Sequence, residues 1–144
     1  MLESEQILSD TVHGNAEAVA RQIEKIHEEE TAALFYNNEQ SLRSVIQLAY
    51  FCYKDYYLKF EELPAGRGYA DIVYLPKKNS PLPVLVVELK WNRSAEGAIA
   101  QIKDRRYPQA LRGYGGEILL VGLSYSKEAA AGKKHTCVIE RFDL

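Results

Sequence analysis

Residues 84–90 have the sequence Val-Leu-Val-Val-Glu-Leu-Lys, a hydrophobic run that ends with two charged side chains. A continuous run of β-branched and leucine residues is typical of a strand that is buried on both faces of a sheet. Glu88 and Lys90 are two residues apart, so both side chains point to the same face of that strand. The run therefore predicts a central strand with a charged pair near its C-terminal end.

A second apolar segment, residues 69–75, precedes this strand and is also interrupted by an acid, Asp71. The loop residues between them, 76–83, favour an antiparallel hairpin. If the loop is centred between Asn79 and Ser80, the pairing places Asp71 opposite Glu88, with their Cβ atoms about 5 Å apart. Two adjacent carboxylates repel each other unless a proton or a cation lies between them.

The three charged residues allow two interpretations. Asp71, Glu88 and Lys90 could form a buried ion-pair network that only fixes the register of the strands, because such clusters are common. They could instead form a Mg²⁺ site, since magnesium is commonly bound by one or two carboxylates together with water and phosphate oxygens. Lys90 would then orient or activate the attacking water, or balance the charge of a phosphate.

The remaining pattern predicts an α/β fold. Apolar residues at helical spacing indicate helices, and short apolar runs indicate strands. The expected helices cover residues 15–30, a segment from Asn38 to about Asp55, and a segment capped by Ser94 that ends near Tyr107; further strands are expected at 57–63, 118–123 and 136–142. The order α-α-β-β-β-α-β-β predicts a mixed central sheet of four to five strands flanked by helices.

Size and composition limit the class of protein. A chain of 144 residues with 47% hydrophobic content is expected to form one domain, with a core over residues 15–142 and a partly ordered extension over residues 1–14. Two distant cysteines and the lack of a signal-peptide pattern predict a reducing, cytoplasmic location. No apolar run approaches the roughly 18 residues that a membrane span needs, so no membrane partner is expected.

Charge is distributed unevenly along the chain. The net charge is only -2, so a binding site for a polyanion must be local. Residues 1–40 carry nine acidic and two basic residues, whereas residues 90–112 carry six basic and two acidic ones. The basic segment could hold phosphates, or it could be a solvated helix face, which is the usual condition of mixed surface charge.

These features together resemble the PD-(D/E)xK nuclease superfamily, which has an acidic residue, then Glu-x-Lys at the end of an apolar strand, then Gln in the next helix. More closely, the chain resembles the nuclease-type domain at the C-terminus of bacterial AAA-ATPase-like proteins, over residues 15–140. The similar blocks are Tyr36–Glu39, Glu62–Pro64, Gly66–Val73, Val87–Trp91, Ala98–Lys103, Leu119–Gly122 and Lys134–Cys137.

The resemblance implies a restriction-endonuclease-like core and assigns roles to individual residues. Asp71 and Glu88 would be metal ligands, with the Leu89 carbonyl as a third oxygen, and Lys90 would position or activate the attacking water. Gln101 would support the site from the helix, although an exposed amide is the alternative. Glu39 would match an acid supplied from the first core helix; the alternative is an acid stabilised by the helix N-terminus.

The implied activity is a Mg²⁺-dependent nuclease, with Mn²⁺ as a substitute and DNA as the expected substrate. Four basic residues are expected to hold its phosphates: Arg67, Arg93, Lys103 and Arg105. The chain has no Gly-x-x-x-x-Gly-Lys-[Ser/Thr] loop, so it cannot itself be the ATP-using part. Expected partners are nucleic acid, an AAA-ATPase-like domain in the same or another chain, and a second copy. A catalytically silent module that docks an ATPase domain or nucleic acid is the alternative.

Overall fold

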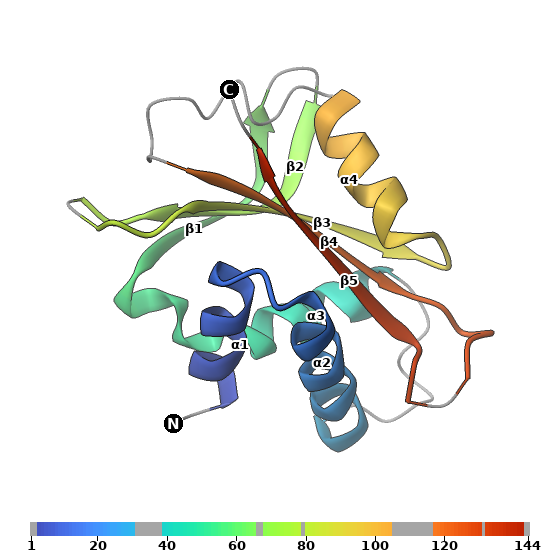
Figure 1. Cartoon of the computed structure of the whole chain (residues 1–144). Coiled ribbons are helices and arrows are strands. Elements are labelled where there is room, and N and C mark those ends of the chain that lie inside the picture. The colour runs from blue at the N-terminus through green and yellow to red at the C-terminus, as the bar shows by residue number, and fades with distance from the viewer. Residues whose placement is uncertain are drawn as a thin grey trace.

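The computed structural model describes residues 3–30, 39–65, 68–78, 80–104, 117–130 and 132–142. Over these residues the predicted α/β class is confirmed (Figure 1). The described residues contain the five predicted strands and one α-helix more than the three that were predicted. The elements are α1 (Glu3–Val12), α2 (Ala16–Glu30), α3 (Glu39–Ala49), the 3₁₀ helix η2 (Phe51–Asp55), β1 (Tyr57–Ala65), β2 (Gly68–Pro76), β3 (Val84–Trp91), α4 (Ala95–Asp104), β4 (Ile118–Tyr125) and β5 (His135–Phe142).

The strands form one mixed sheet in the order β1-β2-β3-β4-β5. All neighbouring strands are antiparallel except β3 and β4, which are parallel and are connected through α4. A parallel pair needs such a crossover, whereas antiparallel neighbours can be joined by a short loop. Helices α1, α2 and α3 cover one face of the sheet, and α4 covers the other (Figure 1).

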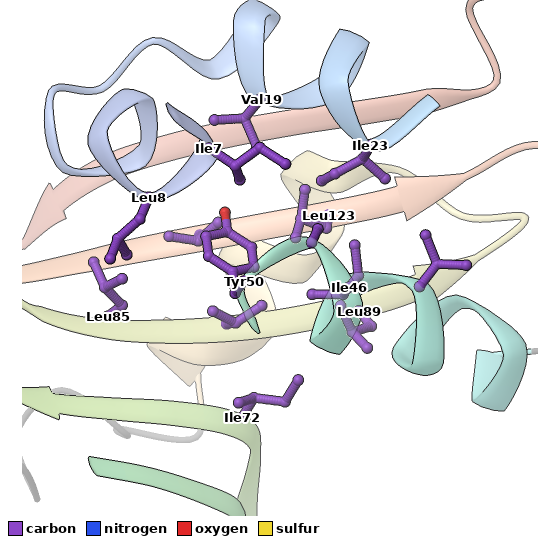
Figure 2. Packing of buried hydrophobic residues seen from close by; sticks show 14 of the residues in the cluster. Ile7, Leu8, Val19, Ile23, Ile46, Tyr50, Ile72, Leu85, Leu89 and Leu123 are labelled. Carbon is purple, nitrogen blue, oxygen red and sulfur yellow. The ribbon is translucent and has the colours of Figure 1, made fainter. Parts of the chain in front are cut away.

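Each face of the sheet has its own hydrophobic core. On the α1–α3 face, side chains from these three helices meet strand residues such as Ile72, Leu85 and Leu89, all of which are fully buried (Figure 2). On the α4 face, Ile99 and Ile102 pack on Val84 and Val86. Fully burying an aliphatic side chain of this size contributes about 1.5–3 kcal/mol, so the sheet is held from both sides.

The N-terminal segment differs from the expectation of a partly ordered extension over residues 1–14. Residues Glu3–Val12 form α1, which buries Ile7 completely in the core. The hydroxyl groups of Thr11 and Tyr50 form a hydrogen bond of 2.6 Å that links α1 to the end of α3. Because buried Thr11 is polar, the inward face of α1 lacks a continuous apolar stripe, which is the signal by which the other helices were predicted.

The second predicted helix also ends earlier than expected. The α-helical hydrogen bonds end with Tyr50, whose N–H donates to the Ile46 carbonyl. The chain then tightens, because the N–H groups of Tyr53 and Tyr56 each donate to the carbonyl three residues before them. Residues 51–55 are therefore a 3₁₀ turn rather than the last turn of an α-helix.

No helix among those that the structure describes is long and apolar enough to cross a membrane.

Candidate active site

The two central hairpin strands stop pairing where the charged residues lie. The pairs between β2 and β3 are Ile72–Val87, Val73–Val86 and Tyr74–Leu85, which confirms the register that the sequence predicted. The next position in that register is Asp71 with Glu88. Here the Asp71 side chain enters the sheet, because its Oδ2 atom accepts a hydrogen bond of 2.9 Å from the Leu89 main-chain N–H.

Asp71 is also held by an arginine that the sequence analysis missed. Arg43 of α3 donates from Nη2 to Asp71 Oδ1 and from Nη1 to the Asp71 carbonyl, both at 3.0 Å. The exposed fractions of the two side chains are only 12% for Arg43 and 18% for Asp71, so the ion pair is shielded from most solvent. A planar guanidinium that donates to two acceptors fixes both the position and the orientation of the carboxylate.

Glu88 has a different environment from Asp71. Its side chain is 2% exposed, and its Oε1 atom accepts a hydrogen bond from the Gln101 amide of α4. Its Oε2 atom is buried and has no hydrogen-bond partner among the described residues. A buried polar atom without a partner costs free energy, so this oxygen is suited to receive a proton or a cation.

Gln101 connects Glu88 to Lys90. Its amide nitrogen donates to Glu88, and its Oε1 atom accepts a hydrogen bond from the Lys90 ammonium. This arrangement uses both ends of the amide, and it excludes the alternative in which Gln101 is merely an exposed side chain. Gln101 of α4 therefore holds the side chains of Glu88 and Lys90 in place on β3.

The close packing of α4 depends on Gly122 of β4, which is paired with Glu88. A Cβ atom at this position would lie 2.5 Å from the Ala95 carbonyl oxygen and 3.2 Å from the Ala98 Cβ. Only a residue without a side chain leaves room for the helix at this distance. The start of α4 is fixed by Ser94, whose hydroxyl accepts the Gly97 N–H at 3.0 Å as the sequence predicted.

The electrostatics of the site favour an uncharged Glu88 in the absence of a cation. Burial, and next the neighbouring Asp71 carboxylate, raise the pKa of Glu88 to about 8, against the opposing effect of the Lys90 ammonium. A carboxyl group normally takes a proton when like charge and low dielectric surround it. A divalent cation between the two carboxylates would replace that proton.

The residues fit a small oxygen-liganded metal ion, although the described part of the chain provides few ligands. No group of three or more His, Cys, Asp or Glu side chains with metal-binding geometry occurs among the described residues. Asp71 and Glu88 are two convergent carboxylates, and each carboxylate oxygen has two lone pairs, so the present hydrogen bonds leave acceptor positions open. Two carboxylates suffice for Mg²⁺, which usually keeps several waters and binds substrate phosphate oxygens.

The other predicted site residues are only partly accounted for. Glu39 is the first residue of α3, the helix that also carries Arg43, but its side chain lies outside the described set. Arg67 and Arg105 lie outside the described residues. Arg93 is exposed in the turn after β3. Lys103 forms a 2.5 Å ion pair with Glu140 of β5, so it extends to the opposite side of α4 from Gln101, which contacts β3.

Comparison with known families places this geometry in context. The sequence model described as the PD-(D/E)XK nuclease superfamily matches residues 37–134. The chain belongs to the PD-(D/E)XK nuclease superfamily. The matched region runs from the residues before α3 to the residue before β5, so it contains Asp71, Glu88, Lys90 and Gln101. No curated protein matches the chain.

Membership in the superfamily agrees with the observed fold. The five-stranded mixed sheet with its crossover helix is consistent with a PD-(D/E)XK fold, as the resemblance implied. The superfamily typically uses a divalent metal ion. Helices α1 and α2 precede the matched region and contribute Ile7, Val19 and Ile23 to the core on the α1–α3 face of the sheet.

Proposed function

We propose that this member of the PD-(D/E)XK superfamily hydrolyses phosphodiester bonds of nucleic acid, with DNA as the expected substrate and Mg²⁺ or Mn²⁺ as the metal. The observation that carries the proposal is the buried Oε2 atom of Glu88, which has no hydrogen-bond partner in the described part of the chain and lies near a second carboxylate and an ammonium group. A structural ion-pair network would be expected to satisfy that oxygen internally. A site that must accept a cation keeps it available.

In this proposal Asp71 and Glu88 hold the metal ion. When bound, a divalent ion polarises the scissile phosphate and lowers the pKa of water. Arg43 and the Leu89 N–H keep the Asp71 carboxylate in a fixed orientation, so that little reorganisation is needed when the site is filled. The Leu89 carbonyl and Glu39 stay predictions as further ligands.

Lys90 acts on the attacking water. Gln101 holds its ammonium beside Glu88, where it can donate a hydrogen bond to a water and align it for in-line attack on phosphorus. The water gives up a proton to the surrounding solvent and forms the new P–O bond as the bond to the 3′ oxygen breaks. The 3′ oxygen takes up a proton, which leaves a 5′-phosphate and a 3′-hydroxyl. Lys90 also provides positive charge close to the charge that develops on the phosphate oxygens.

Flanking phosphates would be held by exposed basic side chains, among them Arg93, which lies two residues after the end of β3. Arg67, Lys103 and Arg105 stay predictions in this role. Contacts to phosphates give affinity without base specificity, and they weaken as counterions compete. Binding is therefore expected to fall steeply between low and physiological salt.

The test is cleavage of plasmid, linear, branched and single-stranded DNA, and of RNA, with Mg²⁺ or Mn²⁺. The wild type is expected to cut at least one substrate, and Lys90→Ala is expected to reduce the rate by about 100-fold or more. Lys77→Ala, which changes an exposed lysine before β3, is the matched control and should cut at the wild-type rate. Equal residual cleavage by wild type and Lys90→Ala would contradict the proposal.

A second function is supported by a different observation. Both oxygens of Asp71 already accept hydrogen bonds within the chain, and Lys90 is bonded to Gln101, as expected for a site that only stabilises the fold. The chain would then be a silent module that docks an AAA-ATPase-like domain or nucleic acid. Titration calorimetry with Mn²⁺ separates the two, since the silent module predicts no binding tighter than about 1 mM.

A further inference from the structure

Strand β1 forms an edge of the sheet. It pairs with β2 on one side, and no strand among the described residues pairs with its other side. Two large apolar side chains of this strand are solvent-exposed, Leu58 at 52% and Phe60 at 39%. An open edge with exposed apolar side chains is a template for pairing with another strand.

The hydrogen bonds of β1 show which of its backbone groups are available. The Lys77 N–H donates to the Tyr56 carbonyl at 3.0 Å, so Tyr56 and Lys77 form a hydrogen-bonded pair in the register of β1 and β2. Hydrogen bonding alternates along an antiparallel strand, so residues 58 and 60 also bond to β2. The N–H and C=O groups of Tyr57, Lys59 and Glu61 therefore point outward, toward the open edge.

The charges on this edge distinguish between the pairings that two copies of β1 could make. Outward-pointing residues must meet outward-pointing residues, which allows a two-fold axis at any residue of β1, including Leu58, Lys59, Phe60 and Glu61. An axis at Leu58 would place each Lys59 opposite a Tyr57, so no opposite charge would lie directly across from the lysine. An axis at Lys59 would place two lysines opposite each other, and an axis at Glu61 would place two glutamates opposite each other. An axis at Phe60 instead places each Lys59 opposite a Glu61, and like charges directly opposite are destabilising.

Both charged side chains are already ordered in the single chain. Lys59 Nζ lies 5.2 Å from the centroid of the Tyr53 ring, and Glu61 Oε1 accepts a hydrogen bond of 2.5 Å from Gln47 Nε2. Less conformational entropy is therefore lost when the two charges meet across an interface. With the axis at Phe60, the two phenyl rings face each other at a non-hydrogen-bonded position, where side chains are closest.

We propose that two copies of this chain associate by antiparallel pairing of their β1 strands about a two-fold axis at Phe60. The two five-stranded sheets then form one continuous sheet of ten strands. Helix α4 packs on β3, β4 and β5, at the other end of the sheet, so it leaves Leu58 and Phe60 exposed for the second copy. The association does not depend on nuclease activity.

Disulfide trapping tests the position of the axis. In a Cys52→Ala, Cys137→Ala background, Phe60→Cys places the Cβ atoms of the two cysteines about 4.5 Å apart, because the position is a non-hydrogen-bonded pair, and a disulfide can bridge this distance. The matched control is Leu58→Cys on the same face, where the two thiols are about 13 Å apart along the strands. Mild oxidation is expected to give a covalent dimer at least about 10-fold faster for Phe60→Cys. Equal rates would overturn the proposal.

Charge exchange tests the pairing of Lys59 with Glu61 by sedimentation equilibrium. Lys59→Glu and Glu61→Lys should each weaken dimerisation by about 10-fold, and the double exchange should restore it to within about threefold of wild type. Lys78→Glu, which makes the same charge change in the β2–β3 loop, should have no comparable effect. A wild type that stays monomeric at about 100 µM, or a double variant no better than the singles, would overturn the proposal.

Discussion

The two carboxylates of the candidate site are neighbours across β2 and β3, yet their surroundings differ. Asp71 accepts hydrogen bonds from a guanidinium and a main-chain N–H, which hold its carboxylate in one orientation. Glu88 is almost fully buried, accepts one hydrogen bond from an amide, and has one oxygen with no hydrogen-bond partner among the residues that the structure describes. On the Asp71 side of the site, the hydrogen bonds are therefore in place before any metal binds. On the Glu88 side, the buried oxygen needs a proton or a cation as its partner.

This difference gives each side a separate role. A ligand that is fixed in advance costs little reorganisation when a metal binds, and an unsatisfied ligand gains most from binding. If both carboxylates were fully satisfied, the site would be a structural ion pair. If both were unsatisfied, the free energy cost to the folded chain would be larger.

The largest expected effect comes from replacing the Glu88 carboxyl group with an amide. Glu88→Gln keeps the shape of the side chain but cannot become an anion, so it should reduce nucleic-acid cleavage by about 1000-fold and abolish Mn²⁺ binding in calorimetry. Glu128→Gln, in the exposed turn after β4, is a matched control. Metal binding by Glu88→Gln at wild-type strength would show that the two sides do not differ as described.

The second effect is on stability in the absence of metal. The pKa of Glu88 is about 8 in the folded chain against 4.5 for an ordinary glutamate, so the folded state binds more protons between these pH values. The free energy of unfolding should therefore fall as the pH rises from 4.5 to 8. Glu88→Gln lacks this loss, and it should be more stable than wild type at pH 8 by up to a few kcal/mol.

Urea denaturation of the metal-free proteins at pH 5 and pH 8 measures this difference. The two proteins should have similar stability at pH 5, where Glu88 is protonated in the folded state. A variant that is less stable than wild type at both pH values would show that Glu88 is a charged member of an internal network. That result would favour the structural interpretation over the metal site.

Gln101 tests the Glu88 side of the site, because its side chain is hydrogen-bonded to Glu88 and Lys90. Gln101→Leu removes the hydrogen bonds to Glu88 and Lys90, and loss of such supporting groups typically lowers metal affinity by about 10–100-fold. Gln47→Leu, which removes an amide that contacts Glu61, is the matched control. Calorimetry with Mn²⁺ should detect the change for Gln101→Leu, and equal affinities would place Gln101 outside the site.

A smaller effect is expected from Arg43→Lys on the Asp71 side. Lysine keeps the charge but cannot donate to Asp71 Oδ1 and the Asp71 carbonyl in the same planar geometry. Mn²⁺ affinity should fall by roughly 10-fold, while Arg141→Lys, at an exposed ion pair with Glu117, should bind as wild type does. An Arg43→Lys variant with tighter Mn²⁺ binding would show that Arg43 competes with the metal rather than orienting its ligand.

The features that depend on local periodicity were predictable from the sequence. The apolar run at residues 84–89 gave the central strand, and the symmetry of the loop at Asn79 and Ser80 gave the register that brings Asp71 to Glu88. The spacing of Glu88 and Lys90 gave their common face. Gln101 was expected from the family resemblance, and the structure shows both of its contacts.

The features that depend on packing between distant segments were not predictable. Arg43 is 28 residues before Asp71, and its contact exists only because α3 packs beside the point where β2 and β3 separate. Helix α1 was missed because the buried side of the helix includes the polar Thr11, whose hydroxyl is satisfied by Tyr50. A pattern of apolar spacing cannot reveal a buried hydrogen bond to a residue 39 positions away.

The most direct measurement is a crystal soaked in Mn²⁺ and recorded at a wavelength that gives manganese anomalous signal. We predict one strong peak between β2 and β3, within about 2–2.5 Å of the Glu88 Oε2 atom and of an Asp71 oxygen. Absence of such a peak at saturating Mn²⁺, with Asp71 still bonded to Arg43 and Glu88 still bonded to Gln101, would contradict the account.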